Sequence, residues 1–107
     1  MRNDLVIGKM IEIIEKLQGY VGDSNYKSFS GNDMLIDACV FNLRQLGEVA
    51  NRIDEEYEES HSDIPWRQIY GLRNRIIHDY EGINLNLIWE IIQEDLPELL
   101  EKLKKIQ

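Results

Sequence analysis

Apolar residues recur every three to four positions through most of the chain, and charged residues fill the positions between them. This spacing places the apolar side chains on one face of an α-helix, and no alternating pattern typical of strands competes with it. We therefore predict helices and no strands. The first helix covers residues 4–21, the second runs from a cap at Ser30 or Asn32 through Ile53, the third begins at Ser62 or Asp63 and ends at or near His78, and the fourth covers residues 85–106.

Most connections between these helices are short, which favours an up-and-down bundle because consecutive helices then pack antiparallel to each other. The predicted fold class is all-α, with four principal helices in a single domain over residues 1–107. Gly71 should weaken the third helix, and Pro97 should kink the fourth because it lacks a backbone N–H. A bundle this small buries little core, so we expect it to pair with a second copy, with the apolar fourth helix contributing to the interface.

The composition is that of an ordinary globular protein. Hydrophobic residues make up 43% and charged residues 30%, which excludes a disordered chain. A single Cys excludes a disulfide scaffold, and two Pro exclude a collagen-like or Pro-rich chain. No apolar run is long enough to span a membrane and the N-terminus lacks a signal peptide, so we expect a cytoplasmic protein. The single cysteine, Cys39, falls in the apolar stripe of the second helix and is predicted to be a small core residue.

The chain is acidic, with 12 Lys and Arg against 20 Asp and Glu and a formal net charge of −8. This charge argues against a protein whose whole surface binds nucleic acid, but it leaves room for a local cationic site. Acidic residues concentrate in residues 54–63, which we interpret as a solvated helix end and loop or as a docking surface for a basic partner. Arg67, Arg73 and Arg75 follow this stretch, so a polyanion would have to bind there or to a second chain.

The common catalytic signatures are missing from the sequence. It has no Gly-rich phosphate loop, no Cys/His spacing for a metal and no Ser elbow, so we expect no metal and no cofactor. Of the two histidines, His61 lies in an acidic loop and is predicted to be a solvated surface residue. His78 is the stronger candidate because Arg73, Asn74 and Arg75 precede it in the same predicted helix.

An ideal helix orients these candidate side chains in different directions. Asn74 lies one turn before His78 and shares its face, and Arg75 lies close by. Arg73, however, is about 140° around the helix axis from His78. Fraying of the last turn, the length of the arginine side chain, or a partner helix across a two-fold axis could bring Arg73 and His78 together.

If these groups converge, their chemistry suits metal-independent cleavage of RNA. The imidazole of His78 can take a proton from a ribose 2′-hydroxyl or give one to the leaving 5′-oxygen. Arg73 can bind the phosphate and stabilise the charge that builds on its oxygens, and Asn74 can orient the imidazole or bind a second phosphate oxygen. The same residues also fit a structural interpretation, in which a histidine ends the helix and the arginines are capping or surface residues.

The segment Arg73-x4-His78-x-Tyr80 matches the R-x4-6-H-x-Y motif of the HEPN superfamily, and its surroundings resemble the HepT-type toxin branch of that superfamily. The resemblance covers nearly the whole chain and is most specific from Pro65 to Pro97. The shared features are the Pro65-Trp66 helix start, the Gly71-Leu72-Arg73-Asn74 step, Trp89 in the following helix, the Leu96-Pro97 step, and Leu46-Gly47-Glu48-Val49-Ala50, which is similar to the family's GEA segment.

The resemblance implies an all-helical homodimer in which the motifs of both copies line a cleft. Its implied activity is that of a metal-independent endoribonuclease, the toxin of a toxin–antitoxin pair, with RNA as substrate. Arg73 and His78 would be the catalytic pair, with Asn74 and Arg75 as supporting residues. The implied partner is an MntA-like nucleotidyltransferase antitoxin, which in this family transfers AMP to the motif tyrosine, here Tyr80. AMP on Tyr80 would add negative charge and bulk where an RNA phosphate must bind.

Two other interpretations stay open. The chain could be a non-catalytic HEPN module that binds a nucleotide or a partner for a separately encoded nucleotidyltransferase. It could also be a helical dimer in which the motif only stabilises the fold, with Tyr80 as an amphipathic aromatic residue at a helix end. The presence of Arg73, Asn74, His78 and Tyr80 together favours the enzyme, because an inactive site need not keep all of them.

Overall fold

The computed structural model describes residues 2–78 and 82–107, and most of these residues are helical, so the predicted all-α class is confirmed. A single short antiparallel strand pair, β1 (Ile77–His78) with β2 (Gly82–Ile83), accompanies the helices in the part of the chain that the structure describes. The helical elements are α1 (Arg2–Val21), α2 (Tyr26–Ser30), α3 (Asp33–Ala50), α4 (Glu55–Ser60), α5 (Trp66–Tyr70), α6 (Leu72–Ile76), α7 (Leu85–Glu90), the π-helical segment η1 (Ile91–Asp95) and α8 (Leu96–Ile106).

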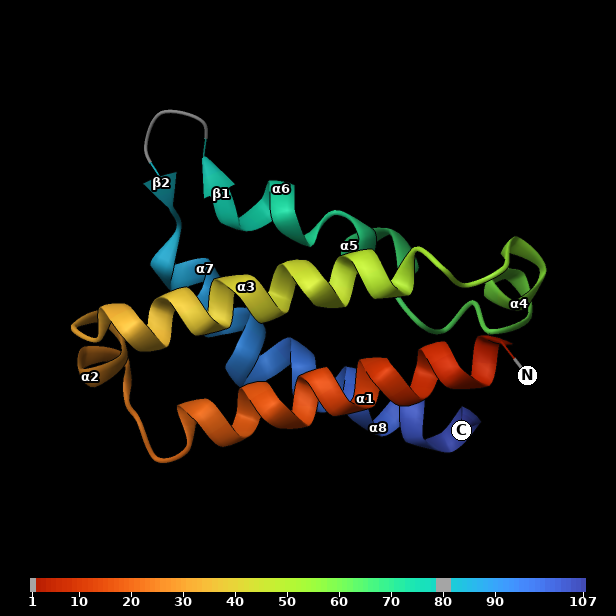
Figure 1. Ribbon diagram of the computed structural model, residues 1–107, viewed down its shortest axis with the longest axis horizontal. Coiled ribbons are helices and arrows are strands. Elements are labelled where there is room, and N and C mark those ends of the chain that lie inside the picture. Colours follow the sequence, from red (N-terminus) through yellow and green to blue (C-terminus); the bar gives the residue numbers. More distant parts are fainter. Residues whose placement is uncertain (1, 79–81) are drawn as a thin grey trace.

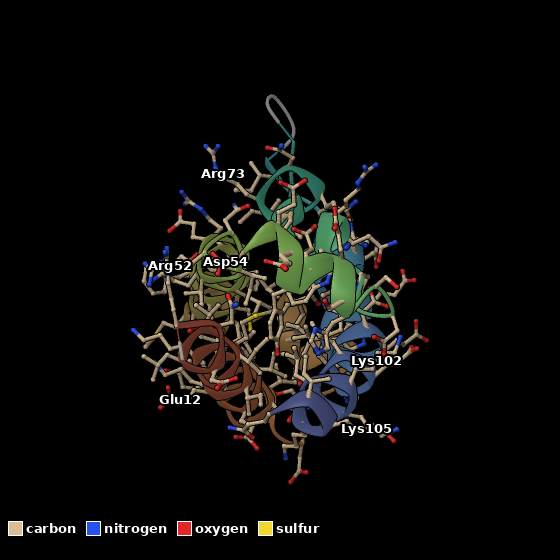
Figure 2. The ribbon with its side chains drawn as sticks, turned by 90° about the vertical axis from the view of Figure 1, so that its right-hand side faces the viewer. Glu12, Arg52, Asp54, Arg73, Lys102 and Lys105 are labelled. Carbon is tan, nitrogen blue, oxygen red and sulfur yellow. The ribbon has the colours of Figure 1, made fainter. Side chains whose placement is uncertain are left out.

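The long helices run in alternating directions along the molecule (Figure 1). α1 and α3 lie side by side and antiparallel, α5 and α6 return along α3, and α8 packs against α1. The strands β1 and β2 lie at the edge of the bundle, on the side away from α8 (Figures 1 and 2). None of the helices in residues 2–78 and 82–107 is long and apolar enough to cross a membrane.

The core forms where the apolar stripes of these helices meet. It includes Ile7, Met10, Ile14 and Leu17 of α1, Cys39, Leu43 and Leu46 of α3, and Leu96, Leu99 and Leu103 of α8. The side chain of Cys39 is fully buried, as predicted, and this burial raises the pKa of its thiol to about 11. At the α2 end of the bundle, Phe29 is fully buried and its ring lies 5.1 Å from that of Trp89.

The third helix is not continuous, and the prediction of no strands is wrong in this region. Gly71 ends α5, with its N–H bonded to the carbonyl of Arg67, and α6 follows for little more than one turn. At Ile77 the backbone is extended (φ −116°, ψ 123°), and β1 begins. Gly82 then adopts a φ of +79°, a conformation that glycine tolerates better than other residues, and the chain returns antiparallel as β2.

Two segments predicted as connections contain short helices. Asn25 caps α2 by accepting from the backbone N–H of Ser28 at 2.8 Å, and the Ser28 hydroxyl accepts from the N–H of Asn25 at 3.0 Å. This reciprocal pair satisfies donors that a five-residue helix would otherwise leave unpaired. The acidic stretch forms α4, whose first turn carries three glutamates, where negative charge complements the helix dipole.

The predicted second and fourth helices are present with small changes. Asn32, one of the two predicted caps, accepts from the N–H of Leu35 at 3.1 Å. The fourth helix spans the predicted residues, but η1 precedes Pro97. Because proline donates no hydrogen bond, the carbonyl one turn earlier loses its partner, and the wider π-helical turn accommodates this loss. The chain changes direction between α7 and α8, in line with the kink predicted at Pro97 (Figure 1).

Candidate functional site

The position of the candidate site depends on a close contact between α3 and the end of α5. Gly47, a buried residue in the last turn of α3, faces the last carbonyls of α5. A Cβ atom added at Gly47 would lie 2.9 Å from the backbone oxygen of Ile69, which is too close for any other residue without a shift of the backbone. The missing side chain therefore lets α5 approach α3, and α6 begins beside the exposed face of α3.

A pocket of about 210 Å³ lies at this junction of α3 with α5 and α6. Its lining residues are Arg44, Gly47, Glu48 and Asn51 from α3 and its end, and Tyr70, Arg73 and Asn74 from α5 and α6. Both arginines are exposed, and neither forms an ion pair with any residue that the structure describes. Figure 2 shows Arg73 projecting from the surface on the same side of the molecule as α3. The pocket thus presents two guanidinium groups whose charge is available to a ligand.

Tyr70 forms a wall of this pocket and is held by its neighbours. Burial, the hydrogen bond to Glu58 and the charge of that carboxylate together raise the pKa of Tyr70 to about 12, and burial is the largest of these causes. The phenol therefore stays protonated at neutral pH and donates to Glu58 of α4. The ring of Trp66 stacks on that of Tyr70 at 6.4 Å, which fixes the first turn of α5 relative to its end.

The structure brings some of the predicted site residues together and separates others. Arg73 and Asn74 line the same pocket. Arg75 lies elsewhere, where its guanidinium is 3.9 Å from the carboxylate of Asp95 and it lines a smaller cavity beside η1 and α8. Residues two positions apart on a helix point to nearly opposite sides, so Arg73 and Arg75 on the short α6 cannot both face α3.

The other two predicted site residues follow α6. His78 lies in β1, paired with Gly82, rather than in a helix, so the helical face that it was predicted to share with Asn74 does not exist. The backbone leaves α6 at Ile77 and carries His78 away in an extended conformation. The placement of the His78 side chain and of Tyr80 lies outside the described residues, so their roles stay predictions.

His61, predicted to be a solvated residue, is partly buried and joins α4 to α5. Its ring stacks on that of Tyr57 at 4.1 Å, and its Nδ1 atom lies 3.0 Å from the carbonyl oxygen of Tyr57. The carbonyl of His61 accepts from the indole N–H of Trp66 at 3.0 Å. These contacts give His61 a structural role at the start of α5.

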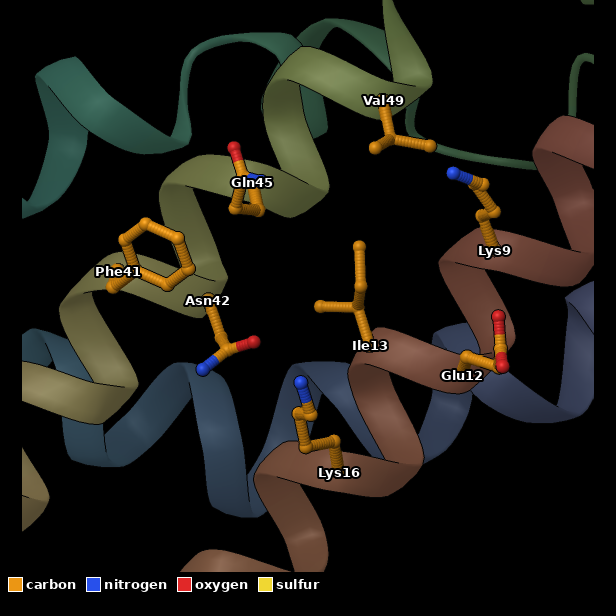
Figure 3. Close-up of a pocket in the computed structure, with 8 residues that line it drawn as sticks. All are labelled: Lys9, Glu12, Ile13, Lys16, Phe41, Asn42, Gln45 and Val49. Atoms are coloured by element: carbon orange, nitrogen blue, oxygen red, sulfur yellow. The ribbon is translucent and has the colours of Figure 1, made fainter.

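A second hollow lies between α1 and α3, with a volume of about 350 Å³ (Figure 3). Lys9, Glu12, Ile13 and Lys16 of α1 face it, as do Phe41, Asn42, Gln45 and Val49 of α3. Phe41 is 61% exposed, and Met34 on the same helix is 84% exposed. This outer face of α1 and α3 therefore carries apolar side chains that the described chain leaves uncovered.

Arg44 and Tyr70 were not identified as candidates from the sequence. The sequence feature that pointed to this part of the site was Gly47, because a glycine inside a long helix indicates the close approach of another element. Arg44 lies three positions before Gly47, and residues spaced in this way share a helix face. The element that approaches Gly47 could not be identified without the tertiary structure.

The fold and the pocket define a mostly helical protein with an arginine-lined surface site suited to a phosphate group. The family model described as "Ribonuclease HepT-like" matches residues 10–106, so the chain belongs to the ribonuclease HepT-like family. A protein of Caldanaerobacter subterraneus subsp. tengcongensis, provisionally named an RNase, is 35% identical over 94 residues, which cover 88% of this chain and 80% of that protein.

Other relatives carry the family name directly. A probable ribonuclease HepT of Thermococcus cleftensis is 27% identical over 90% of this chain and 87% of its own length. An mRNA nuclease HepT of Shewanella oneidensis is 25% identical over 95% of this chain and 98% of its own length. No solved structure matches the chain at a significant level.

Proposed function

We propose that this protein is a metal-independent endoribonuclease that acts in the cytoplasm as the toxin of a toxin–antitoxin pair. Family membership supports RNA cleavage, and the placement of Arg73 carries the assignment of the site. Arg73 lies in a pocket with Asn74 and forms no ion pair with the described residues, in a chain of net charge −8. Because Arg73 stays unpaired with the described residues in so acidic a chain, its guanidinium is suited to bind an external anion.

In the proposed reaction, the ribose 2′-oxygen attacks the adjacent phosphorus and the bond from phosphorus to the 5′-oxygen breaks. The products are a 2′,3′-cyclic phosphate and a free 5′-hydroxyl. His78 takes the proton of the 2′-hydroxyl or supplies the proton of the leaving oxygen. Arg73 binds the phosphate oxygens and stabilises their increased negative charge in the transition state, and Asn74 binds a further oxygen or orients the imidazole.

We propose that two copies form the active protein and that their motifs line a shared cleft. The exposed apolar residues of the long helices are Leu5 and Tyr20 on α1 and Met34 and Phe41 on α3, whereas the large apolar residues of α8 are buried or partly buried. The face of α1 and α3, rather than the fourth helix, therefore supports the interface with a second copy. Arg44 and Phe41 lie less than one turn apart on α3, so this face adjoins the arginine-lined pocket.

We further propose that an MntA-like nucleotidyltransferase silences the enzyme by transferring AMP to Tyr80. The tyrosine lies two positions after His78 in the sequence. A phosphodiester attached there would repel RNA phosphates from the cleft and occupy the space that they need.

The activity has a direct test in the presence of a chelator. Purified protein, shown by mass spectrometry to carry an unmodified Tyr80, should cleave single-stranded RNA in excess EDTA and leave 2′,3′-cyclic phosphate ends. Light scattering on the same sample should give the mass of two chains. Intact RNA at every protein concentration would contradict the proposal and would favour a non-catalytic HEPN module that binds a nucleotide or a partner.

The silencing mechanism predicts a specific behaviour of the Tyr80→Phe variant. This variant should cleave RNA as well as the unmodified protein does, because phenylalanine keeps the ring and loses only the acceptor hydroxyl. Incubation with ATP and the nucleotidyltransferase encoded beside it should add AMP to the wild-type protein and stop its activity, and should leave the variant active. AMP found on another residue of the silenced wild-type protein would contradict this assignment.

A further inference from the structure

We propose that Arg44 is a second phosphate-binding residue of the site and that it binds, from the α3 side, the RNA phosphodiester that Arg73 binds from α6. This inference rests on the proposed ribonuclease function. Arg44 lies upstream of the R-x4-H-x-Y segment by almost thirty positions, and it reaches the site only because α3 and α5 pack closely at Gly47.

The position of Arg44 in the pocket supports this assignment. Arg44 and Arg73 come from different elements and line the same hollow of about 210 Å³, with Asn74 beside them. This volume is below the roughly 300 Å³ of sites that enclose whole small molecules, and it suits a phosphate with part of its sugar in a longer chain. Guanidinium groups that approach a phosphate from two sides can each bind its oxygens through paired N–H donors.

The Arg44 side chain is also available to a ligand. Glu48 lies one turn after Arg44 on α3, a spacing at which opposite charges often pair on a helix. The two side chains nevertheless form no ion pair, and Arg44 pairs with no other residue in the described parts of the chain. Elsewhere on the surface, Lys102 pairs with Glu98 at 3.6 Å and Lys105 pairs with Glu101 at 3.9 Å at this spacing, with the acid first in each pair. Arg44 precedes Glu48, and this reverse order favours pairing less, which leaves the arginine available.

The net charge of the pocket suits a phosphodiester. The charged side chains that line it are Arg44, Arg73 and Glu48, so the hollow carries a single net positive charge. A phosphodiester of the RNA backbone carries one negative charge, whereas a free phosphate or a terminal phosphate carries closer to two. The pocket therefore matches an internal phosphate of an RNA chain better than a mononucleotide.

The salt dependence of RNA binding tests this assignment. The probe is a short single-stranded RNA with 2′-O-methyl groups, which lacks the attacking hydroxyl and stays intact. Each phosphate contact made by a cation contributes about 0.7 to the slope of log affinity against log salt for single strands. Arg44→Ala should lower the slope by about this amount and weaken binding about tenfold at low salt, whereas Arg44→Lys should keep the slope because it keeps the charge.

Arg2→Ala is the matched control because it removes the same charge from an exposed residue at the start of α1. It should leave the slope unchanged. If Arg44→Ala and Arg2→Ala have the same slope and affinity while the wild-type protein binds and cleaves RNA, the assignment of Arg44 is wrong and the ribonuclease function stands. If the wild-type protein neither binds nor cleaves RNA, the ribonuclease function fails and the assignment of Arg44 fails with it.

Discussion

Replacing His78 by alanine should lower the rate of RNA cleavage by at least ~100-fold, the usual contribution of a side chain that transfers a proton in the transition state. The variant should still bind the methylated RNA with nearly wild-type affinity, because the arginines that hold the phosphate are unchanged. Single-turnover cleavage rates and binding isotherms, measured on the same preparations, separate these two effects. His78 lies in a two-residue strand at the edge of the bundle, so we expect the variant to fold normally.

The arginines on α6 supply the matched comparison for this experiment. Arg73→Ala should lower the cleavage rate by about 100-fold or more, since it removes a group that stabilises charge in the transition state. Arg75→Ala removes the same charge two positions away, but its side chain pairs with Asp95 and lines a different cavity. We therefore expect Arg75→Ala to keep most of the activity. Equal losses in the two variants would show that the cleft depends on general positive charge rather than on the pocket beside α3.

Most of the fold could be predicted because the apolar stripes of the long helices are a local property of the sequence. The predicted limits of the first helix agree with α1 to within two residues, and Asn32 was one of two expected caps for α3. The predictions fail at segments whose local sequence signals are weak, or whose secondary structure is determined by tertiary contacts. The α2 helix depends on a reciprocal cap between Asn25 and Ser28, and β1 forms because β2 is available to pair with it.

The candidate site was only partly predictable for the same reason. Arg73 and Asn74 could be proposed from the motif and from the chemistry of their side chains, and the structure places both in one pocket. Arg44 could not be proposed, because Gly47 indicates that some element packs closely beside it but not that this element is α5, followed by α6. The interruption at Gly71 also could not be judged from propensity alone, since a single glycine costs a helix only about 1 kcal/mol and is often tolerated.

The substitution Gly47→Ala tests the close packing of α5 against α3. Its new Cβ would lie 2.9 Å from the backbone oxygen of Ile69, so α5 would have to move away from α3. We expect the free energy of unfolding to fall by about 1–3 kcal/mol, the usual cost of overpacking, as measured by chemical denaturation. RNA cleavage should fall as well in the protein that remains folded, because the movement separates Arg73 on α6 from Arg44 on α3.

Gly8→Ala provides the matched control, because Gly8 also lies inside a long helix and a Cβ there would meet nothing within 4 Å beyond the neighbouring backbone of α1 itself. Alanine is the better helix former by roughly 0.5–1 kcal/mol, so this variant should be more stable than the wild type. The two glycine substitutions therefore have opposite expected signs although their chemistry is identical. If Gly47→Ala stabilised the protein as Gly8→Ala does, the contact between α3 and α5 would be looser than 2.9 Å implies. The junction that positions Arg73 beside Arg44 would then need another explanation.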